Sequence, residues 1–250
     1  MPYTPFKFFA KNQQGKDFVV GDIHGSFTAL EHLLKQAAFQ PATDRLFAVG
    51  DLIDRGAESP RITEFLNYPW FYSIMGNHER MLLDSADDPN LYKSWTSYNG
   101  GAWWNSVSEQ QRDTIRQAVV ELPIAFEVAT GIGRVGIVHA DIPNTMSWTQ
   151  FVQEMQSNPE CTEYALWSRN RFRRIRTLGC GSPIQGIDHV VFGHSPTPQV
   201  LQAGNVHFID TGAALQEEAE LGTLTLLQIH PKLSTHQLNT RTLNLPNTAE

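Results

Sequence analysis

Five short apolar runs along the chain each end at or just before a polar side chain of a kind that binds metal ions. The side chains at these ends are Asp22, Asp51, Asn77, His139 and His194. Short apolar runs of this composition are typical of strands buried on both faces. If the strand ends line one edge of a sheet, these groups meet where open α/β sheets bind their ligands.

Helical periodicity separates the first three runs. Apolar residues recur at helical spacing between positions 27 and 38, where Ser26 is the expected N-cap and Pro41 the expected stop. Ser59 and Pro60 are expected to open a second helix. The order strand, helix, strand, helix, strand requires parallel strands with right-handed crossovers, so the turns after all three strands emerge at one edge.

The second half of the chain combines a polar segment with a β-rich one. Residues 81–121 contain no strand-like run and are expected to form a helical insertion, with Trp103 and Trp104 packed inside it or lining a substrate groove. Runs rich in β-branched or aromatic residues predict later strands at 124–129, 134–139, 189–193, 206–210 and 223–229. The polar stretch 231–250 is expected to form an edge strand followed by a disordered tail.

Composition indicates one soluble α/β domain over residues 1–250, with mixed β-sheets packed as a sandwich and flanked by helices. A chain of 250 residues that is 41% hydrophobic can bury a full core. The net charge of −7 argues against nonspecific nucleic-acid binding. No run approaches the ~20 apolar residues that span a bilayer, and the first residues lack a signal-peptide core, so we expect a cytoplasmic protein without a membrane partner.

Cysteines and a basic run add two minor expectations. Cys161 and Cys180 form no metal-binding pattern and are expected to be reduced thiols. The arginines between Arg171 and Arg176 are expected to be a solvated charge run, with docking of an acidic phosphopeptide as the alternative.

The polar strand ends together form a set that could hold two metal ions. Asp22 and His24 are separated by one residue, so in an extended turn both side chains point the same way and can bind one cation. Asp51 could bridge to a second cation, completed by Asn77, His139 and His194. This mixture of imidazole and carboxylate favours Mn, Fe, Zn or Co over Ca. Two divalent ions and two aspartates leave a charge of about +2, which attracts a phosphate dianion.

Residues beside these ligands indicate how a phosphate ester could be cleaved. A metal pair about 3.5 to 4 Å apart can lower the pKa of a bound water, and the resulting hydroxide can attack phosphorus directly and in line. No covalent phosphoenzyme is then needed. His78 is placed to donate a proton to the leaving oxygen, and Asp54 could hold its ring. Arg55 can offer a bidentate fork to phosphate oxygens. Glu79 is expected to fix loop geometry.

Three segments resemble the linked motifs of the phosphoprotein phosphatase family, within the metallophosphoesterase superfamily. They are GDIHG at 21–25, GDLIDRG at 50–56 and GNHE at 76–79. The short chain and the segment LWSR at 166–169 are similar to the bacterial and phage lambda type of serine/threonine protein phosphatase. The likeness extends over residues 18–213 and is strongest in the first third.

The resemblance implies a calcineurin-like domain that dephosphorylates phosphoserine and phosphothreonine in a phosphoprotein or phosphopeptide, with phosphotyrosine as a further candidate. It implies that Asp22, His24 and Asp51 hold one metal ion and that Asp51, Asn77, His139 and His194 hold the other. It also implies His78 as the acid, Asp54 as its partner, and Arg55 with Arg169 as phosphate ligands. Two divalent ions are expected, with manganese first and iron or zinc as alternatives. No eukaryotic type of C-terminal loop is present, so no obligate regulatory subunit is expected.

Two other functions compete with a protein phosphatase. Symmetrical dinucleoside tetraphosphatases share GDIHG and GNHE, but their second motif typically resembles GDLVARG and lacks the acidic residue that Asp54 supplies here. A catalytically dead phosphoprotein-binding module would be expected to have lost a ligand or the acid, and no such loss is visible. Asp210 is left open between support of the ligands and capping of a turn.

Overall fold

Eleven strands and eight α-helices make up the part of the chain that the computed structural model describes, residues 5–179 and 181–243. The strands are β1 (Phe6–Phe9), β2 (Asp17–Val20), β3 (Arg45–Ala48), β4 (Phe71–Ser73), β5 (Ala125–Thr130), β6 (Gly133–Val138), β7 (His189–Phe192), β8 (Leu201–Ala203), β9 (Val206–Phe208), β10 (Thr223–His230) and β11 (Ser234–Asn239). The helices are α1 (Phe27–Gln36), α2 (Ile62–Leu66), α3 (Asn77–Asp84), α4 (Pro89–Tyr98), α5 (Glu109–Val120), α6 (Trp148–Glu154), α7 (Pro159–Trp167) and α8 (Asn170–Leu178). Short 3₁₀ helices are η1 (Ser59–Arg61), η2 (Gly101–Ser106) and η3 (Thr240–Thr242).

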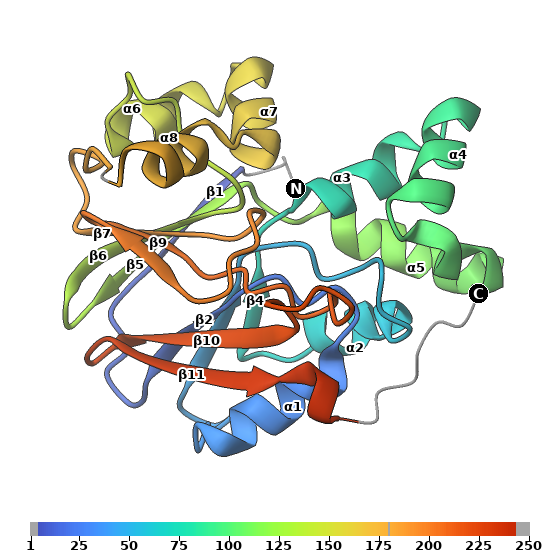
Figure 1. Cartoon of the computed structure of the whole chain (residues 1–250), viewed down its shortest axis with the longest axis horizontal. Coiled ribbons are helices and arrows are strands. Elements are labelled where there is room, and N and C mark those ends of the chain that lie inside the picture. The colour runs from blue at the N-terminus through green and yellow to red at the C-terminus, as the bar shows by residue number, and fades with distance from the viewer. Residues whose placement is uncertain (1–4, 180, 244–250) are drawn as a thin grey trace.

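The strands form two mixed sheets between layers of helices. One sheet has the order β11-β10-β2-β3-β4 and the other β1-β5-β6-β7-β9-β8. Figure 1 shows α1 and α2 beside the first sheet and α6, α7 and α8 beyond the second. The predicted α/β sandwich flanked by helices is therefore confirmed.

Alternation along the strands explains why their sequences are apolar throughout. In β2, Phe18 and Val20 pack with Leu30 of α1, whereas Val19 between them faces the second sheet and packs in the cluster that contains Val191. Successive side chains of a strand point to opposite faces, so a strand covered on both sides needs apolar residues at every position. Burial on both faces therefore explains the continuous apolar runs that lead into the polar loops.

Parallel pairing carries the polar loops to the same edge of the structure. β2 pairs with β3 and β3 with β4, both in parallel, and in the second sheet β6 pairs in parallel with β7. Parallel strands end in the same direction, so the loops that follow them emerge together. As predicted, β2, β3 and β4 and their crossover helices α1 and α2 form one βαβαβ unit.

Several predicted boundaries differ from the structure. Ser26 precedes α1, but its side chain makes no capping hydrogen bond. The helix ends at Gln36, because the chain reverses at Ala38, whose φ is +50°, before Pro41 is reached. Pro60 lies in the 3₁₀ turn η1, and α2 begins only after it.

Residues 81–121 lie in α3, α4, η2 and α5, which form a helical projection beside the first sheet (Figure 1). Two short edge strands, β1 and β8, were not predicted. β11 is the edge strand expected after residue 231, and residues 244–250 lie outside the described part of the chain. None of the described helices has the length and apolar content that a bilayer crossing requires. Cys161 is a buried free thiol, and Cys180 lies outside the described residues.

Candidate metal centre

The loops at the polar edge have unusual backbone conformations. His24, Asp51 and His194 have φ angles of +44°, +50° and +64°. Residues other than glycine rarely adopt this left-handed region, and they cluster at functional sites when they do. The carboxylate of Glu79 accepts the backbone N–H groups of Asp51 and Gly76, each at 2.8 Å. Glu79 thus ties two loops together, which is the kind of role the sequence suggested.

Three histidines turn one ring nitrogen toward the interior of the site. Their other ring nitrogens contact main-chain carbonyls: His24 Nδ1 with Ile53 at 2.8 Å, His139 Nδ1 with Val49 at 2.8 Å, and His194 Nε2 with Trp167 at 3.2 Å. Because a carbonyl oxygen only accepts, each contacting nitrogen carries the hydrogen. The remaining nitrogen faces the site, where a cation could bind it in the usual arrangement of metal-binding histidines.

One group of donor atoms comes from the loops that follow β3, β4, β6 and β7. His139 Nε2 and His194 Nδ1 each lie 2.8 Å from Asn77 Oδ1, and Asp51 Oδ1 lies 3.4 Å from His139 Nε2. These contacts place an amide oxygen and a carboxylate oxygen beside ring nitrogens, an arrangement that a cation between these atoms would satisfy. The donor set suits a divalent transition metal.

A second group of donor atoms shares Asp51 with the first. Ligand atoms of His24, Asp51 and His78 lie within 4.8 Å of one another. Asp22, which the sequence assigned to this position, is not part of that compact group. Its two carboxylate oxygens accept the backbone N–H of His194 at 3.0 and 3.2 Å.

Burial and crowding set the charge of the site. Burial raises the pKa of Asp22 well above its usual range, and the nearby carboxylates of Asp210 and Asp51 add to the shift. Burial also lowers the pKa of His194 to about 2, helped by His139 and Arg169. A neutral imidazole can bind a cation without first losing a proton, and a cation would relieve the crowding of carboxylates.

The predicted acid and its partner are in contact. His78 Nδ1 lies 2.6 Å from Asp54 Oδ2, and both side chains are buried. Arg55 contacts the ring nitrogens of His24 and His78, the latter at 3.2 Å. Arg169 lines the same cavity and donates to the carbonyl of His194 at 3.0 Å.

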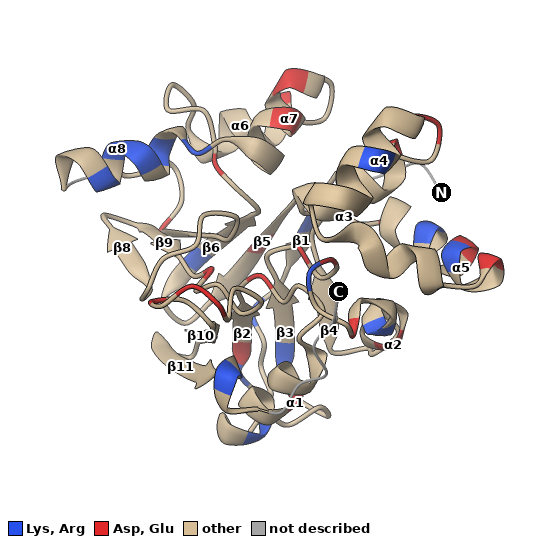
Figure 2. Cartoon of the chain, turned by 45° about the vertical axis from the view of Figure 1, so that its right-hand side comes forward, with Lys and Arg blue, Asp and Glu red and all other residues tan. Residues whose placement is uncertain are grey.

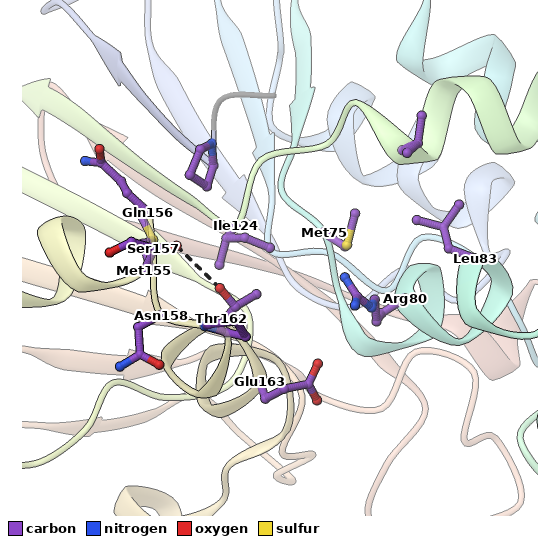
Figure 3. Close-up of a pocket in the computed structure, with 13 residues that line it drawn as sticks. Met75, Arg80, Leu83, Ile124, Met155, Gln156, Ser157, Asn158, Thr162 and Glu163 are labelled. Carbon is purple, nitrogen blue, oxygen red and sulfur yellow. Dashed lines mark hydrogen bonds between the residues drawn. The ribbon is translucent and has the colours of Figure 1, made fainter. Parts of the chain in front are cut away.

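These groups line a polar cavity of about 180 Å³, with Asp22, Asp51, Arg55, Asn77, Arg169 and His194 in its walls. A larger cavity of about 480 Å³ lies between α3 and the α6–α7 region, with Met75, Ile124 and Met155 among its lining residues (Figure 3). Among the described residues, both groups of metal-ligating side chains contribute to or adjoin the smaller cavity and none lies in the larger one. Chemistry rather than size therefore identifies the candidate site, which can hold divalent cations and a small anion.

Two hydrogen bonds to Asp54 could not be predicted from the sequence. The indole nitrogens of Trp95 and Trp103 donate to Asp54 Oδ2 and Oδ1, at 2.6 and 2.7 Å. Trp103 thus packs inside the helical segment, as expected, and also reaches the acid pair. Asp54 is separated from these tryptophans by 41 and 49 positions, so no local motif links them.

Of the two alternatives for Asp210, the structure shows the turn cap, and support of the ligands stays a prediction. Its Oδ1 accepts the N–H of Gly212 at 2.9 Å, which caps a turn, and its carboxylate also lines the cavity beside Asp22.

The basic run is only partly a solvated face. Arg171 is buried and donates through Nε to Asp141 at 2.9 Å, so the prediction was wrong for this residue. The remaining arginines of α8 are exposed, and Figure 2 shows this helix as a blue segment without acidic residues.

Comparisons with known proteins identify the family of the chain. The profile of calcineurin-like phosphoesterases matches residues 18–216. The chain is 37% identical over 216 residues to serine/threonine-protein phosphatase 1 of Salmonella typhimurium, covering 85% of this chain and 91% of that protein. It is 32% identical over 218 residues to serine/threonine-protein phosphatase 2 of Escherichia coli, covering 85% and 94%. A symmetrical bis(5'-nucleosyl)-tetraphosphatase of Pseudomonas entomophila is 33% identical over 133 residues, covering 50% of this chain and 39% of that protein.

Solved structures share the fold at lower sequence identity. A protein serine/threonine phosphatase from Saccharomyces cerevisiae has a TM-score of 0.63 and 15% identity, covering 94% of this chain and 84% of that chain. A cold-active protein-tyrosine phosphatase of a Shewanella species has a TM-score of 0.58 and 16% identity, covering 93% and 80%. At these identities the likeness shows the fold alone.

Proposed function

The chain belongs to the calcineurin-like phosphoesterase family, and we propose that it is a metal-dependent phosphatase acting on phosphoserine and phosphothreonine in proteins. The observation that carries this proposal is the convergence of two groups of donor atoms on Asp51. A carboxylate shared between two groups is what a bridging ligand of a two-metal site requires. The matches to serine/threonine-protein phosphatases over most of the chain supply the substrate class.

Six side chains would hold the two ions. Asp22 lies outside the compact group of His24, Asp51 and His78 but lines the same cavity, so Asp22, His24 and Asp51 are proposed for one ion. Asp51, Asn77, His139 and His194 are proposed for the other. We propose manganese, with iron and zinc as alternatives, following the resemblance to the bacterial and phage lambda type of phosphatase; the mixed oxygen and nitrogen donors suit a divalent transition metal. When bound, the two ions supply an activated water and positive charge for the phosphoryl oxygens.

The remaining roles belong to side chains of the chain itself. Arg55 and Arg169 would bind phosphoryl oxygens from two sides of the cavity. Asp54 holds His78 through Nδ1 at 2.6 Å, which leaves His78 Nε2 on the cavity side. Because Arg55 lies 3.2 Å from that nitrogen, a phosphate on its guanidinium would bring the leaving oxygen near His78. His78 would then donate the proton that a serine or threonine alkoxide needs to leave.

A comparison of kcat/KM between substrates tests this proposal. The purified chain, supplied in turn with manganese, iron or zinc, would be given peptides with phosphoserine, phosphothreonine or phosphotyrosine, and separately diadenosine tetraphosphate. We expect metal-dependent phosphate release with the highest kcat/KM on phosphoserine or phosphothreonine peptides. A higher kcat/KM on diadenosine tetraphosphate would instead make the chain a nucleotide hydrolase. Binding of phosphopeptides without any hydrolysis would indicate a binding module.

A further inference from the structure

Trp95 and Trp103 reach from the helical segment 81–121 to the carboxylate of Asp54. Trp103 Nε1 donates to Oδ1 at 2.7 Å, and Trp95 Nε1 donates to Oδ2 at 2.6 Å. Oδ2 also contacts His78 Nδ1 at 2.6 Å. A buried carboxylate that is bound at one oxygen only can turn about its own axis and leaves the other oxygen unsatisfied. Two donors from a packed aromatic cluster remove that freedom.

The backbone that carries Asp54 also depends on the helical segment. Asp54 and Arg55 are consecutive residues with φ of +74° and +66°. Such a conformation costs free energy and persists only when its surroundings hold it. Here the N–H of Arg55 donates to the carbonyl of Gly100 at 3.0 Å. A side chain at Gly100 would lie 2.6 Å from the Arg55 nitrogen, so only glycine permits this approach.

We propose that Trp95 and Trp103 are positioning residues that fix the Asp54 carboxylate, and through it the ring of His78, in the orientation needed for proton donation. This inference rests on the function proposed above. The tryptophans do not touch the substrate. Their indole N–H groups set the plane of the carboxylate, which in turn directs His78 Nε2 toward the cavity. The helical segment therefore contributes to the acid step although it carries none of the proposed metal ligands.

Trp104 supplies a matched control. Trp104 follows Trp103 in η2, and both residues are buried, with an exposed fraction of 2% for Trp104 and 7% for Trp103. Its ring lies 5.3 Å from that of Trp103 and 5.8 Å from that of Trp95, measured between centroids. Its indole is not among the described donors to Asp54. Replacement of Trp104 by Phe thus tests the loss of packing without the loss of that hydrogen bond.

The experiment compares Trp95→Phe, Trp103→Phe and Trp104→Phe in the full chain with saturating manganese. Phenylalanine keeps much of the ring but has no N–H. For kcat on a phosphoserine peptide, whose alkoxide leaves poorly, we expect a loss of about tenfold or more for Trp95→Phe and Trp103→Phe. On p-nitrophenyl phosphate, whose phenolate needs little protonation, the loss should be under about threefold. KM should stay unchanged, and Trp104→Phe should affect both substrates equally.

Equal losses on both substrates for Trp95→Phe and Trp103→Phe would overturn the inference, as would the same substrate selectivity in Trp104→Phe. A second measurement does not depend on turnover. In the Asp54→Asn variant the indole N–H resonances of Trp95 and Trp103 should shift while that of Trp104 stays in place. If the wild-type chain hydrolyses no phosphate ester and these shifts still occur, the proposed function fails and the contact stands. Absence of the shifts would overturn the positioning role.

Discussion

Two buried aspartates, Asp51 and Asp141, are almost equally hidden from solvent, at 2% and 1% exposure, yet their surroundings differ in kind. Asp141 is satisfied by the chain itself, because it accepts Nε of Arg171 at 2.9 Å and the backbone N–H groups of Arg171 and Ile142. Asp51 accepts one backbone N–H, from His78, and otherwise faces imidazole nitrogens.

The difference separates structural from functional burial. A polar group that the fold satisfies completely stabilises the fold, since its desolvation is offset by hydrogen bonds within the chain. A polar group that faces other potential ligand atoms can be completed from outside, and for Asp51 we propose cations. Replacement by alanine should therefore affect different properties at the two aspartates. We expect it to remove metal binding and activity at Asp51 and to lower stability at Asp141.

The largest effect is expected from Asp51→Ala. Removal of the shared carboxylate should abolish binding of both ions and lower kcat/KM by at least about 10⁴-fold, because the charge stabilisation supplied by the ions is lost. Metal content by mass spectrometry and phosphatase activity should fall together. Retention of both ions, or of activity without them, would show that Asp51 is not a shared metal ligand.

Asp141→Ala should act on the free energy of unfolding. It leaves the Arg171 guanidinium buried without its carboxylate, which typically costs about 3 to 5 kcal/mol. Urea unfolding measures this loss. The folded fraction should still bind two ions per chain, and loss of the metals in folded protein would show that Asp141 serves the site directly.

A smaller effect is expected from His78→Asn and Asp54→Asn. Both should lower kcat by about 10²-fold, while the ions stay bound, because the leaving oxygen is no longer protonated. A phenolic substrate should suffer less than an alkyl phosphate. Equal losses on both substrates, measured in parallel with metal content, would remove His78 from the role of acid.

His207 provides the mildest test, through pH. Burial, together with the charge of His189, lowers the pKa of His207 to about 4. The unfolded chain, with an ordinary histidine pKa near 6.5, then binds more protons between about pH 6.5 and 4, so stability falls as the pH is lowered through that window. His207→Gln should make the decline between pH 7 and pH 5 shallower by on the order of 1 to 2 kcal/mol. Urea unfolding curves of both proteins at pH 7 and pH 5 measure this difference. An equal loss of unfolding free energy between the two pH values in both proteins would contradict the prediction.

The parts of the molecule that sequence reasoning reached are those set by local pattern. Asp22, Asp51 and Asn77 follow parallel strands whose apolar runs are visible in the sequence, so topology alone brings their loops to one edge. His139 and His194 follow strands of the second sheet in the same way.

Contacts between distant segments remained beyond sequence reasoning. The Asp54 turn gives no sign that it receives Trp95 and Trp103, because these donors come from helices whose packing angle is set by the whole core. Arg171 looks like one member of a solvated run until Asp141 is brought beside it. Such partners depend on tertiary packing, for which a single sequence carries no periodic signal.

We expect side chains that follow strands of both sheets to hold two ions bridged by Asp51. Crystals grown with excess manganese, with diffraction data collected at the manganese absorption edge, test it most directly. We expect two anomalous peaks about 3.5 to 4 Å apart on either side of the Asp51 carboxylate. A cavity without peaks, or peaks that avoid Asp51, His139 and His194, would contradict it.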